Sequence, residues 1–149
     1  MKKLLLIAAI TMTAVSACFA QGPTGTTQMV NEEFGIIAQE LELEQLQMHH
    51  LSKILEKKAK EIIPLKNQIK ALKERGEHIN ANDAKAKAYI ENEVSNIRAR
   101  IKQLTSEADE AITEHLNEEQ TAKYYDEVKP KIEEKRKASA DRANASKKQ

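Results

Sequence analysis

The sequence predicts an all-α protein built around a long antiparallel helical hairpin, and three observations lead to this expectation. Aromatic residues make up only 3% of the 149 residues and Trp does not occur, whereas sandwiches and barrels are rich in aromatic and β-branched side chains. Gly and Pro, which mark the frequent turns of β folds, number only four and three. The remaining composition is dominated by residues that favour helices, such as Ala, Glu, Lys, Leu and Gln.

Two apolar seams predict the arms of this hairpin. Both repeat in steps of four and three, which is the heptad pattern of helices that pack along their whole length. The turn between Gly76 and Asn82 is short, so the arms should fold back on each other. Each arm of about 30 residues would be roughly 45 Å long, and a lone hairpin of this kind needs further helices or a partner chain to bury its faces. The first seam, interrupted only by Lys58, is Leu51, Leu55, Lys58, Ile62, Leu65, Ile69 and Leu72, and the second is Ile90, Val94, Ile97, Ile101, Leu104, Ala108 and Ala111.

The segments outside the hairpin are assigned from composition and from helix signals. Residues 21–30 contain Gly, Pro and Thr without an apolar period and predict a flexible linker. The helical domain is expected over residues 31–134, and it opens with a short helix over Glu32–Leu41 capped by Asn31. Residues 135–149 carry six Lys and Arg against one Asp, without any period, and predict a disordered basic tail.

A last helix should begin at Asn117 and carry Tyr124, Val128 and Ile132. Pro130 lies within this segment and removes one backbone donor. The helix is therefore expected to kink, or to end near Lys129.

Residues 1–20 predict a secretory signal peptide. A positive start and an apolar run up to Val15 are followed by small residues that suit cleavage after Ala20. Residues 15–18 also fit a lipobox, and in that alternative Cys18 would be acylated and the chain would be an envelope lipoprotein. In both cases the single Cys is not available for an internal disulfide, so stability must come from helix packing.

The charge balance and the motifs of the sequence argue against nucleic-acid binding and against catalysis. The 24 Lys and Arg nearly cancel the 23 Asp and Glu, whereas binding a nucleic acid needs a clear positive surplus. No Gly-rich phosphate loop is present, and no Ser-His-Asp or Cys-His set can be proposed as a catalytic site. We therefore expect neither enzyme activity nor a cofactor.

Two similar pentads precede the two halves of the fold. The second begins with Leu116 and Asn117 and ends with Gln120, which fits a capping box in which the Asn and the Gln satisfy each other's backbone N–H groups. The first begins with Leu43 and ends with Gln47, but its cap position holds Glu, a poor N-cap, so that this helix could instead run on from the one before.

At these pentads the chain resembles the Spy/CpxP family of periplasmic proteins, whose mark is a paired Leu-Thr-x-x-Gln motif. Asn117 and Glu44 stand where the family usually has Thr, so the first copy is degenerate. The leader, the Lys-Glu-Ile-Ile-Pro-Leu-Lys run at 60–66 and the helix–turn–helix layout are also similar, and the resemblance covers about residues 36–134.

The resemblance implies a small helical homodimer shaped like a curved cradle, which acts as an ATP-independent chaperone or envelope-stress protein in the periplasm. Its partners would be unfolded or misfolded envelope proteins, held on a mixed apolar and charged surface that native proteins do not bind. Apolar residues that lie off the seams are candidates for this surface, with the alternative that most of them complete the core or a dimer interface. These client-binding candidates are Met48, Ile54, Ile63, Ala71 and Ile112.

Two alternative functions remain open. Some relatives of the family respond to zinc, and the candidate ligands for a zinc-binding stress regulator are His49 and His50. Adjacent helical residues point about 100° apart, and His-x-x-x-His spacing is absent, so a solvated or packing role is the competing interpretation. The other alternative is a structural coiled-coil spacer or lipoprotein that tethers partners.

Overall fold

The computed structural model describes residues 25–79 and 83–145, and these residues form helices without any strand. The all-α prediction is therefore confirmed. The helices, in chain order, are α1 (Gly25–Glu40), α2 (Gln45–Glu77), α3 (Ala84–Thr113), α4 (Glu118–Lys123), the π-helix η1 (Tyr124–Val128) and α5 (Lys129–Ala145).

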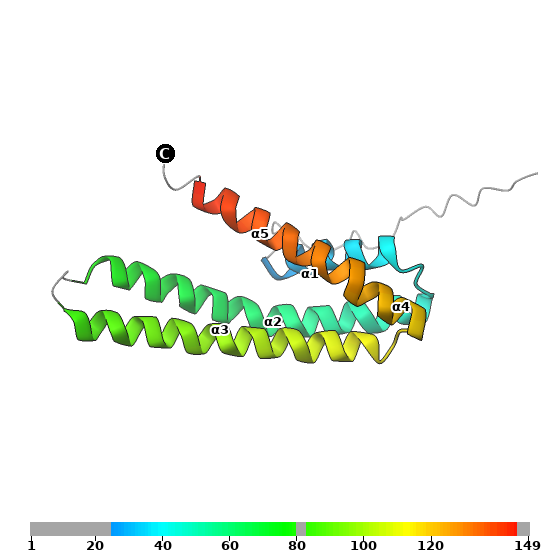
Figure 1. The fold of residues 1–149 in the computed structure, drawn as a ribbon, viewed down its shortest axis with the longest axis horizontal. Helices are drawn as coiled ribbons and strands as arrows, with labels where there is room; N and C mark the ends of the chain where they lie inside the picture. The colour runs from blue at the N-terminus through cyan, green and yellow to red at the C-terminus, as the bar shows by residue number, and fades with distance from the viewer. Residues whose placement is uncertain (1–24, 80–82, 146–149) are drawn as a thin grey trace, which may run out of the picture.

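The hairpin predicted from the two seams is formed by α2 and α3, which lie side by side in opposite directions (Figure 1). Asp83 caps the start of α3, since its carboxylate accepts a hydrogen bond from the backbone N–H of Ala86 at 3.0 Å. Near the turn, Gly76 faces the side chain of Ile90, and a Cβ at the glycine would lie 3.7 Å from it. The two arms therefore stay in contact up to the turn.

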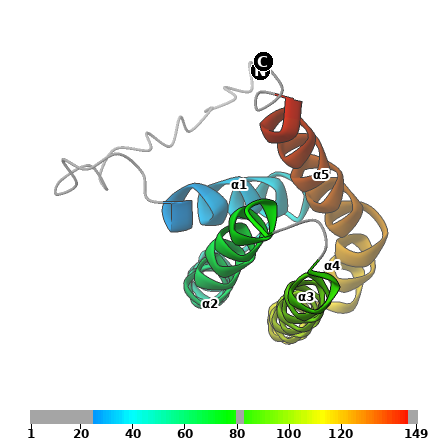
Figure 2. The ribbon, with the colours of Figure 1, turned by 90° about the vertical axis from the view of Figure 1, so that its left-hand side faces the viewer.

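A second layer covers one half of this hairpin. Helix α1 and the continuous run of α4, η1 and α5 lie above the end where α2 begins and α3 finishes (Figures 1 and 2). The core lies between the layers and contains the fully buried side chains of Ile37, Leu51, Ile112, Tyr124 and Val128. This second layer leaves the other half of the hairpin uncovered (Figure 1).

The predicted linker and the start of the first helix are corrected by α1. Residues 25–30 are helical, so the helix begins at Gly25 rather than at Glu32; residues 21–24 lie outside the described part of the chain. The reason is packing, because Val30 is buried and Met29 packs against the core. Burial of these side chains outweighs the weak helix propensity of Gly and Thr.

The predicted disordered tail is corrected by α5, which continues to Ala145; residues 146–149 lie outside the described range. Its sequence consists mostly of Ala, Lys, Arg and Glu, which favour helices without any apolar period. Ion pairs from Lys131 to Glu40 (2.8 Å) and from Arg136 to Glu33 join the helix to α1.

The irregularity expected at Pro130 takes the form of a π-helix, and the helix does not end near Lys129. In a regular α-helix the ring of Pro130 would meet the carbonyl of Asp126, four residues earlier. Here the segment Tyr124–Val128 is π-helical, and the N–H of Lys129 reaches back five residues to the carbonyl of Tyr124. The wider turn accommodates the proline, and the helix continues.

No helix within residues 25–79 and 83–145 is both long enough and apolar enough to cross a bilayer.

Candidate functional site

The second pentad forms the capping box that its sequence predicts. The Asn117 side chain accepts a hydrogen bond from the backbone N–H of Gln120 at 2.8 Å, and the Gln120 side chain accepts one from the backbone N–H of Asn117 at 3.1 Å. Helix α4 therefore starts after Asn117, with Leu116 packed against the core just before it.

The first pentad also starts a helix, so α2 does not run on from α1. Residues 41–44 leave the helical path, and the Gln47 side chain accepts a hydrogen bond from the backbone N–H of Glu44 at 2.9 Å. Leu43 packs against the core beside this turn. The glutamine of the motif thus performs its expected role although Glu occupies the cap position.

The two pentads meet in space, which sequence reasoning did not anticipate. The amide of Gln47 donates to Oε1 of Gln120 at 2.8 Å and to the carbonyl oxygen of His115 at 2.9 Å. The start of α2 is therefore joined to the start of α4 and to the end of α3. We call this set of residues, Gln47, His115 and Gln120, the motif junction.

A group of histidines lies beside the motif junction. The rings of His50 and His115 stack with centroids 4.4 Å apart and planes 6° apart, and His49 meets His50 edge-on at 6.0 Å. Burial lowers the pKa of His50, and the neighbouring His115, His49 and Lys53 lower it further. Within the described residues, no group of three or more His, Cys, Asp or Glu side chains is placed to hold a metal ion. Among the described residues, the fold therefore does not bring His49 and His50 into a set of three or more such side chains that could hold zinc.

A buried carboxylate links the two layers. Glu33 of α1 lies 2.8 Å from the ammonium group of Lys58, and both side chains are almost fully removed from solvent. Arg136 of α5 binds the other oxygen of the same carboxylate through its Nε and Nη2 atoms. Lys58, the one polar residue in the first seam, thus adds a buried polar contact from α2 to α1 and, through Glu33, to α5.

A second polar contact holds the π-helix against α3. The buried hydroxyl of Tyr124 donates to Asp109 at 2.8 Å, and Lys129 pairs with the other oxygen of this carboxylate at 2.8 Å. Burial raises the pKa of Tyr124, and the Asp109 carboxylate raises it further. The hydrogen bond to Asp109 likewise raises the pKa of Lys129. Both groups therefore keep their protons, and the contact persists at neutral pH.

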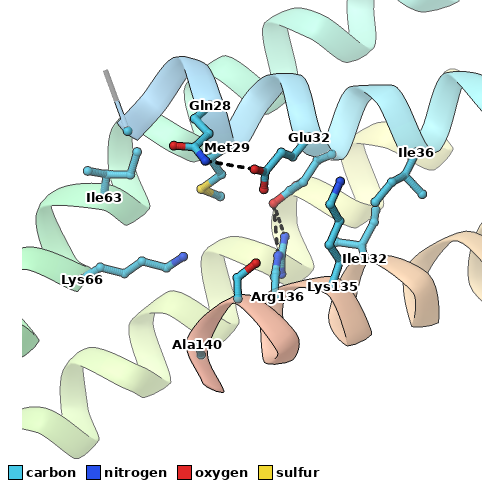
Figure 3. Close-up of a pocket in the computed structure, with 13 residues that line it drawn as sticks. Gln28, Met29, Glu32, Ile36, Ile63, Lys66, Ile132, Lys135, Arg136 and Ala140 are labelled. Atoms are coloured by element: carbon cyan, nitrogen blue, oxygen red, sulfur yellow. Dashed lines mark hydrogen bonds and ion pairs between the residues drawn. The ribbon is translucent and has the colours of Figure 1, made fainter. Parts of the chain in front are cut away.

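A pocket of about 380 Å³ opens between α1, α2 and α5 (Figure 3). Glu33 and Arg136 lie in its wall, and Lys66 of α2 and Lys135 of α5 extend toward it from opposite sides. Its apolar wall is made of Met29, Ile36, Ile63 and Ile132.

The five client-binding candidates occupy different environments. Ile112 is 0% exposed and belongs to the core, so its place on a client surface is wrong. Ile54 and Ile63 are half-buried and pack against the same core, although Ile63 also lines the pocket. Met48 is half-buried at the start of α2, and Ala71 is exposed on the uncovered half of the hairpin.

The apolar surface that sequence reasoning missed is the outer part of the seams themselves. Beyond the second layer most seam residues of α2 and α3 are only half-buried, although Ile90 and Val94 remain buried, and exposed Lys, Arg and Glu side chains surround them. Nothing in the sequence indicated that burial decreases along the seams, because the apolar spacing is the same along both arms. We call this surface the open seam; it consists of Leu65, Ile69, Leu72, Ile97 and Ile101.

Comparison of the chain with protein-family models, with curated proteins and with solved structures finds no match. The predicted signal peptide and Cys18 lie outside the residues that the structure describes.

Proposed function

We propose that this protein is an ATP-independent chaperone of the bacterial envelope, which holds unfolded clients on an amphipathic helical surface. The single observation that carries the proposal is the open seam, where apolar side chains remain accessible among charged ones. The paired motif, whose two copies meet at the motif junction, is consistent with the resemblance to the Spy/CpxP family.

Selectivity for unfolded chains follows from what each state of a client exposes. An unfolded segment offers apolar side chains that can cover the open seam, and the surrounding charges keep the surface soluble when it is empty. A native client buries those side chains and gains nothing from binding. Such a surface delays aggregation by mass action and needs no nucleotide.

Light scattering of an aggregation-prone client tests this function. We expect the protein to suppress aggregation at equimolar amounts without nucleotide, and Tyr89→Gln and Leu72→Gln to weaken suppression, since both residues lie on the uncovered half of the hairpin. Tyr89 is 62% exposed and can be replaced without opening the core. The matched control is Leu46→Gln, which removes a 67% exposed apolar side chain at the covered end. An unchanged scattering curve at equimolar or higher amounts of the wild-type protein would contradict the function.

We further propose that the chain is exported to the periplasm and acts as a homodimer. Sedimentation of the mature protein measures the oligomeric state, and a monomer at all concentrations would contradict the dimer. A mass spectrum of the mature N-terminus distinguishes cleavage after Ala20 from acylation at Cys18.

A further inference from the structure

The charges around the pocket between α1, α2 and α5 are not balanced. Three cations, Lys66, Lys135 and Arg136, line it together with two carboxylates, Glu32 and Glu33. Glu33 is already shared between Arg136 and the buried Lys58, which does not line the pocket. The pocket and its immediate surroundings therefore hold more cations than anions.

Two cations in this group, Lys66 and Lys135, have no carboxylate in ion-pair contact within the described residues. Arg136 is near enough to repel Lys66, and Glu33, already bound by Arg136 and Lys58, offsets this repulsion only in part. Lys66 is exposed at its outer side, but partial burial lowers its pKa, and the Arg136 guanidinium lowers the pKa further while the Glu33 carboxylate raises it. An anion placed beside Lys66 would stabilise the charged ammonium and so oppose both effects.

Most of the remaining wall is apolar and comes from three different helices, with Gln28 and Ser139 as its uncharged polar residues. Met29 and Ile36 of α1, Ile63 of α2 and Ile132 of α5 surround the space into which Lys66 extends (Figure 3). A pocket of about 380 Å³ is within the size range of small-ligand sites, which combine apolar walls with a few placed polar groups.

We propose that this pocket binds a medium-chain fatty acid, whose carboxylate lies beside Lys66 and whose alkyl chain lies against Met29, Ile63 and Ile132. The charge surplus selects an anionic head over a neutral or cationic one. A single alkyl chain suits a wall of flexible Met and branched aliphatic side chains, with no aromatic residue among those that line the pocket. This inference does not depend on the chaperone proposal, which concerns the open seam.

Calorimetric titration of the full mature protein with octanoate tests the site, and 1-octanol and octylamine serve as probes of the same chain length. We expect octanoate to bind about tenfold more tightly than octanol, because a charge-assisted contact to a lysine contributes on the order of 1.4 kcal/mol. Added salt should weaken the binding of octanoate and leave that of octanol unchanged.

Substitutions locate the binding to the pocket. Lys66→Gln should remove the preference for octanoate while octanol still binds, and Ile63→Asn should weaken both probes. The matched control is Lys102→Gln, which removes an exposed lysine of α3, a helix that contributes no residue to the pocket. A thermal melt of each variant shows that it is folded.

Equal affinity for octanoate and octanol, or an undiminished preference in Lys66→Gln, would overturn the proposed anion site. The absence of measurable octanoate binding at millimolar concentration would overturn the site altogether.

Discussion

The two halves of the α2–α3 hairpin have the same seam pattern but differ in what covers them. Where the second layer lies above the hairpin, Leu51, Leu55 and Ile112 are at most 1% exposed. In the uncovered half, Ile90 and Val94 are still buried, but the residues of the open seam are only half-buried. Two helices alone therefore bury part of a seam, and a second layer is needed to complete the burial.

This difference assigns separate roles to the two halves. The covered half contains the core, the motif junction and the polar contacts of Glu33 and Asp109, which give the fold its stability. The uncovered half has fewer buried contacts, so it should open locally at lower free energy. For the chaperone that we propose, a surface that must adapt to many client segments is best built on the less stable half.

The largest effect is expected for Glu33→Ala, because Glu33 joins α1 to both α2 and α5. The substitution leaves Lys58 buried without a carboxylate, and breaking such a pair lowers the free energy of unfolding by about 3–5 kcal/mol. Urea denaturation followed by circular dichroism measures the loss.

The neighbouring Glu32→Ala is the control for this substitution. Glu32 is half-buried and accepts a hydrogen bond from Gln28 within the same helix, so its replacement should change stability by about 0.5 kcal/mol or less. If the two substitutions had the same small effect, Glu33 would not be what holds the second layer in place.

The next largest effect compares the two halves directly. Leu55→Ala removes a side chain that is 1% exposed, and the lost burial and the resulting cavity should lower the free energy of unfolding by about 2–5 kcal/mol. Leu72→Ala removes a half-buried side chain and should lower it by only about 1 kcal/mol. Equal losses in urea denaturation would show that the open seam is covered in solution, and the distinction between the halves would then fail.

The motif junction provides an effect of intermediate size within the covered half. Gln47→Ala and Gln120→Ala each remove a capping side chain and the hydrogen bond between the two, and each should lower the free energy of unfolding by about 1–2 kcal/mol. The double variant should lose less than the sum of the two, because both single changes break the same contact. Gln45→Ala, at an exposed position, is the control, and strict additivity would argue against the junction.

The sequence predicted the hairpin well because its seams are long and regular. Both arms, their antiparallel packing and the capping box at Asn117 follow from spacing and helix-start signals that are local in the chain. The prediction was wrong at the two ends, residues 25–30 and 135–145, where composition suggested irregular chain. There the helices depend on contacts with distant residues, such as that of Arg136 with Glu33, and helix propensity does not reflect such contacts.

The candidate sites were less accessible to sequence reasoning for the same reason. In the sequence Lys58 only interrupts the apolar seam. The fold brings Glu33 into contact with Lys58, and Arg136 into contact with Glu33. The pocket around Lys66 needs α5 to pack beside α1 and α2, although α3, α4 and η1 lie between them in the chain. The available signal was Lys58, a lysine in an otherwise apolar seam, since a buried charge requires a partner of opposite charge.

The smallest effect concerns the histidines beside the motif junction. The folded state lowers the pKa of His50 below its ordinary value of 6.5, because burial and the nearby His115 disfavour the charged ring. The unfolded chain therefore binds this proton more readily, so stability is fully present above pH 6.5 and falls as the pH is lowered past that value. His50→Gln should reduce the fall in the urea midpoint between about pH 7.5 and about pH 5.5, whereas His78→Gln, at the exposed end of α2, should not. The effect is small because His50 remains in contact with solvent, and an identical pH dependence in wild type and His50→Gln would show that the stacked rings do not couple protonation to folding.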